Sequence, residues 1–309
     1  MDANKPLVSL GLPVYNGENF LAETLESLLA QTYTNFEIII CDNLSTDRTS
    51  EICAEFAARD ERISYFCQSK NLGAARNFNT TFERSRGKYF KWASHDDLLE
   101  PEYLERCVAA LEADPDVVIC WPHMDHVDSQ ARHMRNQEID DLSIMAEGYA
   151  ARLRQLFDYQ IAGDDVIPTI FGLMRRDVLA KTGLWRRYTS SEEILMLELL
   201  YYGKVRQLPE TLFHFRIHED SAFHANRTPA EREKWFDTEK HYVLQLPIWF
   251  LLGRYYVRVS TLGLPLWVKL RCYYEITRRA VFLWRRYAGD LIKYLGQFVG
   301  YRYEYRGKA

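Results

Sequence analysis

The chain has 309 residues, of which 47% are hydrophobic and 27% are charged. This length allows one large hydrophobic core, or a core with a small appended unit. The formal net charge of -4 gives no reason to expect a nucleic-acid partner. The charge is unevenly distributed, because residues 246–309 carry 12 Lys/Arg and 3 Asp/Glu, whereas residues 1–245 sum to -13. A basic, aromatic C-terminal region on an acidic body predicts a surface that binds an anionic partner.

Three features predict a cytoplasmic protein. The N-terminus has no basic segment before an apolar run, so no signal peptide is expected. The six cysteines are scattered without a CxxC pair, and they are predicted to be free thiols, most of them buried, as in a reducing compartment. No apolar run reaches the roughly 20 residues that a membrane-spanning helix needs.

Strands and helices alternate over the first 121 residues. Apolar runs predict strands at 7–12, 36–41, 62–66, 88–93 and 116–121. Helical spacing of apolar residues predicts helices from about 17, at 47–59 and 72–85, and from Pro101 onward. Such alternation predicts a mostly parallel sheet that is covered by helices on both faces.

The remainder of the chain divides into three parts. Residues 122–170 are expected to form loops that cap a site. A helix at about 192–202 and a strand-like segment at 205–218 follow. From residue 229 the chain is predicted to be helical, which divides it into a catalytic domain at 1–228 and a C-terminal helical region at 229–309.

Polar residues follow each of the first four predicted strands, at the point where the strand ends. The four clusters are residues 13–16 (PVYN), 42–43 (DN), 71–73 (NLG) and 96–97 (DD). Ligands of parallel α/β sheets bind at the carboxyl ends of the strands. The four clusters are therefore predicted to converge and to form a site.

Adjacent carboxylates follow the fourth predicted strand. Asp96 and Asp97 repel each other unless a cation or a positive group lies nearby. A divalent ion that also binds a diphosphate needs only one or two protein carboxylates, and capping of the next helix is the alternative explanation. Asp42 can accept hydrogen bonds from a base or a ribose hydroxyl, with a turn-forming role as the alternative.

Later residues add candidates for chemistry. Glu192 and Glu193 begin an apolar helix, where acids suit the helix dipole or where one of them acts as a general base. His218 is either a ligand of a metal or phosphate or an ordinary polar residue. Arg76 and Asn77 follow the NLG cluster and are candidates for contact with a phosphate or with another part of a ligand bound at this edge.

Several common motifs are missing. The chain has no GxGxxG after the first strand, no GxxxxGK[ST] and no GxSxG. Their absence disfavours a dinucleotide-dependent dehydrogenase, a P-loop enzyme and a hydrolase with the usual nucleophile elbow. A nucleotidyltransferase is also disfavoured, because VYNGEN at 14–19 is not a Gly-rich, basic loop.

In three segments the chain resembles family 2 of the inverting glycosyltransferases, which have the GT-A fold. These segments cover most of residues 6–221 and read VSLGLPVYNGENFLAETLESLLAQTYTNFEIIICDNLSTDRTSEI, NLGAARNFNTTFERSRGKYFKWASHDDLLEPEYLE and SSEEILMLELLYYGKVRQLPETLFHFRIHEDS. The resemblance implies a GT-A (Rossmann-like) α/β sheet flanked by helices. It also implies transfer of a sugar from a nucleotide diphosphate, with UDP-sugars the commonest donors, to an acceptor hydroxyl.

The resemblance assigns roles to residues of this chain. SHDD at 94–97 occupies the place of the family's Asp-x-Asp motif, which implies Mg²⁺ or Mn²⁺ as the cofactor. Glu192 matches the catalytic base, with Glu193 as the second candidate. The metal ligands are expected to be Asp96, Asp97 and His218. The nucleotide and donor ligands are expected to be Pro13, Tyr15, Asn16, Glu18, Asp42, Asn43, Asn71, Gly73, Arg76, Asn77, His95 and Arg216.

Two positions depart from the family pattern. Ser94 stands where many members have the first aspartate, and Glu192-Glu193 replaces the usual Glu-Asp pair, so the assignment of the base could shift by one residue. Ser94 favours an alternative in which the chain is a non-catalytic sugar-nucleotide-binding or assembly protein. Asp96, Asp97 and Glu192 favour the enzyme.

The C-terminal region predicts contact with a membrane. Arg271, Arg278 and Arg285 recur every seven residues, and apolar residues lie near the opposite face of the same helical stretch. Such a helix can lie in a membrane interface, with a subdomain packed on the core or a homo-oligomer contact as the alternative. We predict peripheral binding at the inner face of an anionic membrane. A glycan or lipid-linked acceptor in cell-surface polysaccharide or glycolipid synthesis fits this location.

Overall fold

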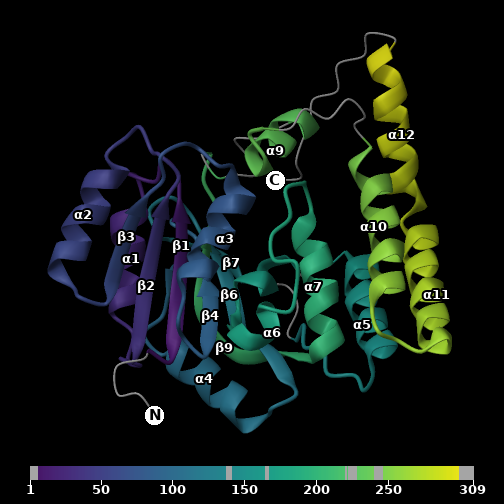
Figure 1. Cartoon of the computed structure of the whole chain (residues 1–309), viewed down its shortest axis with the longest axis horizontal. Helices are drawn as coiled ribbons and strands as arrows, with labels where there is room; N and C mark the ends of the chain where they lie inside the picture. The colour runs from purple at the N-terminus through teal and green to yellow at the C-terminus, as the bar shows by residue number, and fades with distance from the viewer. Residues whose placement is uncertain are drawn as a thin grey trace.

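A computed structural model describes residues 6–136, 141–163, 167–219, 221, 228–239 and 246–298. Within these residues the chain forms a 9-stranded sheet with helices on both faces (Figure 1). A layer of helices from the C-terminal region stands at the end of the molecule opposite the N-terminal strands (Figure 1). This mixed α/β architecture confirms the predicted fold class.

The N-terminal half forms the parallel part of the sheet. Its strands are β1 (Val8–Val14), β2 (Phe36–Asp42), β3 (Ile63–Cys67) and β4 (Tyr89–Trp92), in the spatial order β3-β2-β1-β4. The helices that connect them are α1 (Leu21–Leu29), α2 (Thr49–Arg59) and α3 (Ala74–Arg84). Every residue of β1, β2 and β4 is buried, as expected of strands covered on both faces. The strands and helices predicted for this half are confirmed.

The register of the parallel strands brings their carboxyl ends together. Val14 at the end of β1 lies beside Asp42 at the end of β2, and Asp42 lies beside Cys67 at the end of β3. On the other side of β1, Gly11 lies beside Trp92 at the end of β4. The four polar clusters that follow these strands therefore leave the sheet at one edge, as predicted.

The second half of the sheet is mixed. Its strands are β5 (Leu98–Leu99), β6 (Val117–Val127), β7 (His133–Asn136), β8 (Leu173–Arg175) and β9 (Lys204–Arg216). Strand β8 runs antiparallel to both β4 and β6, whereas β9 runs parallel to β6 and antiparallel to β5. The path across the whole sheet is β3-β2-β1-β4-β8-β6-β9-β5, with β7 paired to β6.

The prediction that residues 122–170 are loops is wrong for the described part of that segment. Strand β6 continues to Val127, and β7, helix α5 (Tyr149–Ala162) and a short 3₁₀ helix, η1 (Ile167–Phe171), follow it. Polar residues such as Asp125 interrupt the apolar pattern of β6. Backbone pairing with β9 nevertheless extends the strand, and the Asp125 carboxylate is held by the ring of His214 on β9.

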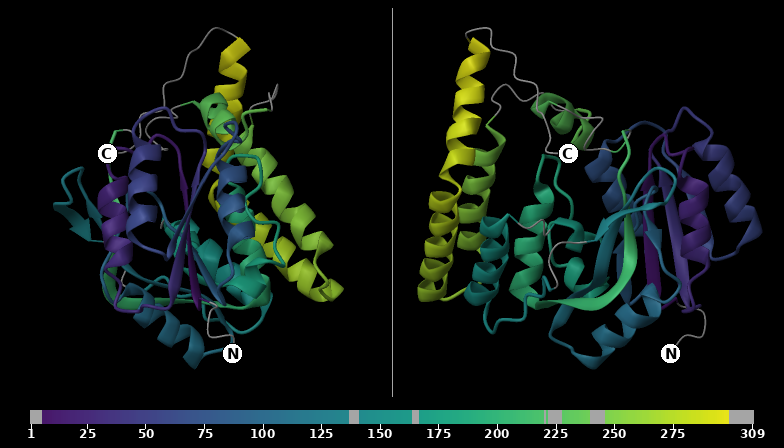
Figure 2. Two further views of the ribbon diagram at one scale, coloured as in Figure 1. Left: turned by 60° about the vertical axis from the view of Figure 1, so that its left-hand side comes forward. Right: turned by 180° about the vertical axis from the view of Figure 1, so that it is seen from behind.

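The helices of the central part cover the sheet and approach its functional edge. They are α4 (Tyr103–Ala113), α6 (Arg176–Leu179), α7 (Ser191–Tyr202) and α9 (Pro229–Phe236). Helix α7 is buried at Ser191 and from Ile194 to Leu200, whereas Glu192 and Glu193 are half-buried. Helix α9 begins with a capping box between Thr228 and Glu231. In Figures 1 and 2, α9 lies above the carboxyl end of the sheet.

The C-terminal region forms a layer of helices, which we call the C-terminal layer. It consists of α10 (Pro247–Thr261), α11 (Leu266–Phe282) and α12 (Trp284–Phe298), standing side by side next to α5 (Figures 1 and 2). Among the described helices, none has the length and apolar character needed to cross a membrane. The helical character predicted from residue 229 onward is confirmed for the described residues, and the domain boundary at 228/229 stays a prediction.

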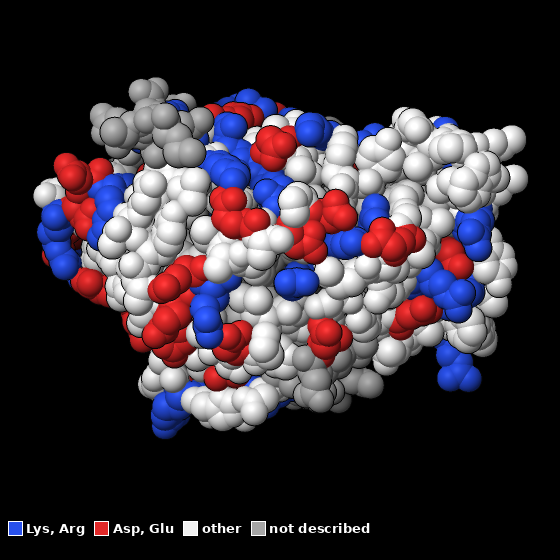
Figure 3. All heavy atoms as spheres, turned by 90° about the horizontal axis from the view of Figure 1, so that it is seen from below, with Lys and Arg blue, Asp and Glu red and all other residues white. Residues whose placement is uncertain are grey.

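The cysteines and the surface charges bear on two features noted in the sequence, of which the structure decides the first. Five of the six cysteines are buried and all six are free thiols, but Cys67 is exposed because it is the last residue of β3. On the face shown in Figure 3, acidic and basic side chains are interspersed over the body of the molecule. The right-hand end of that view has a broad neutral area with basic side chains beside it (Figure 3).

Candidate functional site

The loops after β1 and β2 are joined by their own polar side chains. The Asn16 Oδ1 atom accepts a hydrogen bond from the Thr46 backbone N–H at 2.9 Å, and the Glu18 carboxylate accepts one from the Arg48 N–H at 3.0 Å. Asn16 has a positive φ of 52°, a conformation that Asn adopts more readily than most residues. Tyr15 is 44% exposed beside them, whereas Pro13 is buried in β1. These predicted nucleotide ligands therefore also shape the loops that would hold a nucleotide.

Asp42 lies at the base of this loop pair and is fully buried. One carboxylate oxygen accepts hydrogen bonds from the Ser45 N–H at 2.9 Å and the Ser45 hydroxyl at 2.6 Å, and the other accepts one from the Tyr65 hydroxyl at 3.1 Å. Burial, followed by repulsion from Asp42, raises the pKa of Tyr65, so Tyr65 remains a donor. The Asp42 carboxylate is thus held in one orientation, with lone pairs left for a further donor.

The loop after β3 is built from amide side chains. Asn43 donates to Asn71 Oδ1 at 2.9 Å and accepts from the Leu72 N–H at 2.8 Å. Gly73 has a φ of 78° and begins α3 directly under α9, where an added Cβ atom would lie 2.7 Å from the Phe236 carbonyl oxygen. Glycine is required there because other residues are strained at this φ and would meet that carbonyl.

Two predicted donor ligands lie on the first turn of α3. Asn77 is buried and donates to the Cys41 carbonyl oxygen at 2.7 Å, while its Oδ1 atom has no hydrogen-bond partner among the described residues. Arg76 is exposed on the adjacent face. A buried amide oxygen without a partner is rare in native proteins and is typical of a ligand contact.

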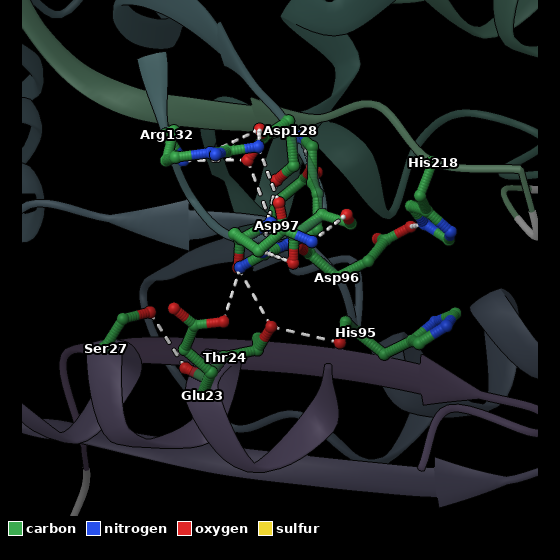
Figure 4. Close-up of polar contacts among 12 residues, drawn as sticks. Glu23, Thr24, Ser27, His95, Asp96, Asp97, Asp128, Arg132 and His218 are labelled. Atoms are coloured by element: carbon green, nitrogen blue, oxygen red, sulfur yellow. Dashed lines mark hydrogen bonds and ion pairs between the residues drawn. The ribbon is translucent and has the colours of Figure 1, made fainter. Parts of the chain in front are cut away.

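The fourth polar cluster pairs Asp96 with a residue 122 positions later. The His218 Nε2 atom lies 2.9 Å from Asp96 Oδ2, and the Ser94 hydroxyl donates to the other carboxylate oxygen. Figure 4 shows Asp96 and His218 pointing toward each other, with the His95 ring on the same side. Burial alone would raise the pKa of Asp96, but His95 and the hydrogen bonds from His218 and Ser94 outweigh it and lower that pKa to about 2. Asp96 is therefore ionised at neutral pH.

Asp97 has the opposite environment. Its carboxylate is buried and accepts a hydrogen bond from the Arg216 backbone N–H at 3.0 Å. Burial, followed by repulsion from Asp96, raises the pKa of Asp97 well above its usual value, against the attraction of Lys91 and Arg216. Burial also lowers the pKa of Lys91 to about 8, an effect that Asp97 opposes. Asp97 thus contributes to the buried support of the site.

The predicted three-residue metal group is not formed within the described residues. No group of three or more His, Cys, Asp or Glu side chains there has a geometry that could hold a metal ion. Asp96 and His218 lie together, but Asp97 points toward the backbone of Arg216. The physical reason is that the chain bends at His95 and Asp96 before β5 begins, and the Asp97 carboxylate is held by the Arg216 N–H on its other side.

Arg216 supports the loop and does not face open space. It is 1% exposed, and its Nε atom donates to the Asp96 carbonyl oxygen at 2.7 Å. Its two terminal nitrogens donate to the carbonyl oxygens of Asp128 and Ser129 and to the Glu23 carboxylate. Four of the five guanidinium N–H donors of Arg216 already have protein partners, which favours a supporting role, and contact of Arg216 with the donor stays a prediction.

The two candidate bases on α7 have different surroundings. Glu193 accepts hydrogen bonds from Gln160 of α5, Tyr255 of α10 and Arg279 of α11. Glu192 is half-buried on the first turn of the same helix, after Ser190, which has a φ of 63°. The carboxylate of Glu193 is therefore turned toward the C-terminal layer.

The segment before α7 packs against the site edge, and no pattern in the sequence predicted this. Asn79 of α3 exchanges two hydrogen bonds with the Trp185 backbone, at 2.8 and 3.0 Å, and the Trp185 ring lies 4.6 Å from the Phe78 ring. The Thr189 N–H donates to Glu233 of α9 at 3.3 Å. These contacts bring α7 and α9 to the edge of the sheet where the polar loops meet. In the sequence, the only signal is that Phe78 and Asn79, which make these contacts, directly follow the predicted ligand Asn77.

Comparison with known proteins identifies the family of this chain. The sequence profile described as "Glycosyl transferase family 2" matches residues 9–183, and the chain belongs to this family of enzymes. An uncharacterized glycosyltransferase of Rickettsia typhi is 41% identical over 106 residues, which are 34% of this chain and 32% of that protein. Glycosyltransferase GlyA of Streptococcus pneumoniae is 39% identical over 98 residues, which are 32% of this chain and 14% of that protein. The match thus covers a third or less of the length of these relatives.

Solved structures show the same fold. TarS of S. aureus, in complex with UDP-GlcNAc, superposes with a TM-score of 0.64 and 16% identity, over 88% of this chain and 72% of that one. The mannosyltransferase PcManGT of Pyrobaculum calidifontis, in complex with GDP-Man and Mn²⁺, gives a TM-score of 0.55 and 14% identity, over 97% of this chain and 82% of that one. At these identities the likeness establishes the GT-A fold.

Proposed function

We propose that this chain is an inverting glycosyltransferase that moves a sugar from a nucleotide diphosphate to an acceptor hydroxyl, with UDP as the proposed nucleotide. The observation that carries the proposal is the ionised Asp96 paired with His218 at the sheet edge where the loops after β1, β2 and β3 also end. Membership of family 2 supports it. UDP is favoured because TarS, which shares the fold, binds UDP-GlcNAc.

A divalent cation is proposed as the cofactor. Mg²⁺ or Mn²⁺ would be held by Asp96 and His218, with the donor diphosphate supplying further oxygen ligands. The residues fit in their chemistry, because Asp96 is ionised and its Oδ2 atom lies 2.9 Å from the His218 Nε2 atom, so a carboxylate oxygen and an imidazole nitrogen face each other. A bound cation would stabilise the charge that develops on the leaving diphosphate.

The nucleotide is proposed to lie across the loops after β1, β2 and β3. The Asp42 carboxylate, fixed by Ser45 and Tyr65, would accept a hydrogen bond from the base or the ribose. Tyr15 would cover the base, and the free Asn77 Oδ1 would accept a hydrogen bond from the donor. The remaining residues proposed to line this pocket are Pro13, Asn16, Glu18, Asn43, Asn71, Gly73, Arg76 and His95.

Glu192 is proposed as the general base. It would take the proton of the acceptor hydroxyl while that oxygen attacks the anomeric carbon from the side opposite the leaving diphosphate. Glu193 is less suited to this role because Arg279, Tyr255 and Gln160 occupy its carboxylate. The held geometry of donor and acceptor supplies much of the remaining rate.

A thermal-shift series tests this function. UDP with Mn²⁺ is expected to raise the melting temperature, because a ligand that binds only the folded state stabilises it. Asp96→Asn should remove the Mn²⁺-dependent part of the shift. A released-UDP assay with UDP-sugars then measures turnover. Metal-independent nucleotide binding without turnover would support the alternative of a non-catalytic sugar-nucleotide-binding protein, which Ser94 in place of an aspartate favours.

The outer face of the C-terminal layer is proposed to bind an anionic membrane. Trp267, Tyr274 and Trp284 are 63%, 65% and 60% exposed there. Glu275 and Asp290, the two acids of residues 246–298, are buried, so the charge on the exposed face is basic. Tryptophan and tyrosine favour the membrane interface, and each exposed Arg adds about 1 kcal/mol near anionic lipid. A glycan or lipid-linked acceptor in the synthesis of cell-surface polysaccharide or glycolipid fits this arrangement.

Vesicle flotation tests the membrane proposal. The protein should float with vesicles that contain phosphatidylserine and remain unbound with neutral vesicles. Replacing the exposed Arg271, Arg285 and Arg286 with glutamine should weaken binding roughly 100-fold, because about 3 kcal/mol is removed. A stable homo-oligomer in solution that covers Trp267 and Trp284, with no vesicle binding, would instead assign this face to a contact between copies.

A further inference from the structure

Two buried carboxylates of α7 are bonded to the C-terminal layer. Glu193 lies in the first turn of α7, and Glu198 lies farther along the helix and is fully buried. Each receives an arginine from the C-terminal layer, Arg279 of α11 for Glu193 and Arg258 of α10 for Glu198. A buried carboxylate without such a partner would be costly. The helix that carries Glu192 is thus bonded to the C-terminal layer at two points.

The Glu193 contact is a closed network of hydrogen bonds. Arg279 donates to Glu193 Oε2 at 3.2 Å and to Gln160 Oε1 at 2.6 Å, and Gln160 donates to Glu193 at 3.2 Å. The Tyr255 hydroxyl of α10 donates to the same Glu193 oxygen. Arg279 is 6% exposed and its guanidinium lies 5.2 Å from the Tyr255 ring centre. Three helices therefore fix one carboxylate, next to the residue proposed as the base.

The Glu198 contact extends this support to the segment before α7. Arg186 lies 2.5 Å from Glu198 Oε1, and the Gly183 N–H donates to Glu198 Oε2 at 2.8 Å. Arg258 of α10 pairs with the same carboxylate. The turn that leads into Ser190, with its positive φ, is therefore anchored to the buried side of α7.

We infer that the C-terminal layer positions the catalytic end of α7, with Arg279 and Glu193 as positioning residues for Glu192. This inference rests on the proposed function, because it assigns a role relative to the proposed base. A shift of about 1 Å in a catalytic group can lower turnover about 100-fold. The contacts at Glu193 act on the same turn as Glu192 and not on the nucleotide loops, so turnover should fall while nucleotide affinity stays unchanged.

A matched pair of arginines on α11 tests the inference. Arg279→Met removes the partner of Glu193. Arg278→Met removes its neighbour, which bonds Asp158 of α5 at 2.6 Å and Glu275 of its own helix at 2.6 Å. Neither of these partners of Arg278 belongs to α7. Both changes remove one positive charge from the same helix. The readouts are kcat, the KM for a UDP-sugar, the UDP-dependent thermal shift and the melting temperature without ligand.

Arg279→Met is expected to lower kcat about 100-fold with an unchanged UDP-dependent shift, whereas Arg278→Met should keep kcat within about twofold. The double variant Glu193→Gln with Arg279→Met restores neutrality, because it removes both charges of the pair. The glutamine can still accept hydrogen bonds from Tyr255 and Gln160. It should recover at least about tenfold of the turnover lost by Arg279→Met alone. If Arg279→Met does not fold, the double variant and Tyr255→Phe, which removes one hydrogen bond without a charge change, carry the test.

Three results would overturn the inference. Equal kcat values for Arg279→Met and Arg278→Met would show that the network is structural only. A double variant as inactive as Glu193→Gln alone would point to Glu193 itself as the base. Parallel losses of kcat and of UDP affinity would mean that the network supports the whole site. Failure of the proposed function is recognised separately, because the wild-type protein would then release no UDP.

Discussion

Replacing Arg216 with methionine tests whether this buried arginine supports the loop or binds the donor. Methionine keeps much of the apolar volume but leaves the carbonyl oxygens of Asp96, Asp128 and Ser129 without their donor. Asp96 is buried, whereas Asp128 is half-buried and Ser129 is exposed. Water can therefore reach the last two carbonyls, and only the orphaned Asp96 carbonyl has the full cost of a buried acceptor, about 1–3 kcal/mol. The fourth partner, Glu23, is 51% exposed and can be solvated by water, so it adds little. The expected loss is therefore about 1–3 kcal/mol in the free energy of unfolding.

Urea and thermal unfolding measure this loss directly. At about 2–4 °C per kcal/mol for a domain of this size class, the melting temperature should fall by about 5 °C. Glu23→Gln is the matched control, because it removes only the exposed partner of Arg216 and should cost less than about 1 kcal/mol. An Arg216→Met protein of wild-type stability with a weakened UDP-dependent shift would refute the reasoning and return Arg216 to the donor site.

Three further predictions concern single residues. Glu192→Gln should abolish UDP release in the presence of acceptor while the UDP-dependent thermal shift persists, and normal turnover would exclude Glu192 as the base. The pKa of Lys91 is lowered from 10.5 to about 8 by burial, so the unfolded state binds more protons between these values and stability rises with pH there. The free energy of unfolding in urea, taken as wild type minus Lys91→Met, should therefore rise by up to about 3 kcal/mol between about pH 8 and 10. A difference that does not change with pH would contradict the lowered pKa of Lys91. Gly73→Ala places a Cβ atom 2.7 Å from the Phe236 carbonyl at a φ of 78° and should cost at least about 1–2 kcal/mol in chemical unfolding, whereas an unchanged stability would show that α9 shifts freely.

The parallel half of the sheet could be predicted from the sequence because its signals are local. The strands β1, β2 and β4 are mostly apolar, interrupted only by Ser9, Glu37 and Lys91 before their polar ends, as is typical of strands buried on both faces, and each is followed by a polar cluster. The rule that parallel strands share one carboxyl edge then places those clusters together. The register of Val14, Asp42 and Cys67 confirms that placement.

The second half of the sheet could not be read in the same way. Strand β6 contains Asp125 and His126, which break its apolar pattern, and it is extended through backbone pairing with β9, far away in the chain. Helix α5 has arginine on its buried side, because Arg152 donates to the Leu200 carbonyl at 2.8 Å. Such elements depend on partners that no local pattern contains.

The sequence by itself determined the family, the fold class and the edge of the sheet where the site forms, because local apolar patterns and motif order carry that information. Only the tertiary structure separated the roles of neighbouring residues with the same chemistry. It turned Asp96 toward His218 and Asp97 toward the Arg216 backbone, and it directed Glu193 to Arg279 beside the proposed base Glu192. These differences arise from partners between 86 and 122 residues distant in the chain, whose positions follow from how the whole sheet and its helices pack.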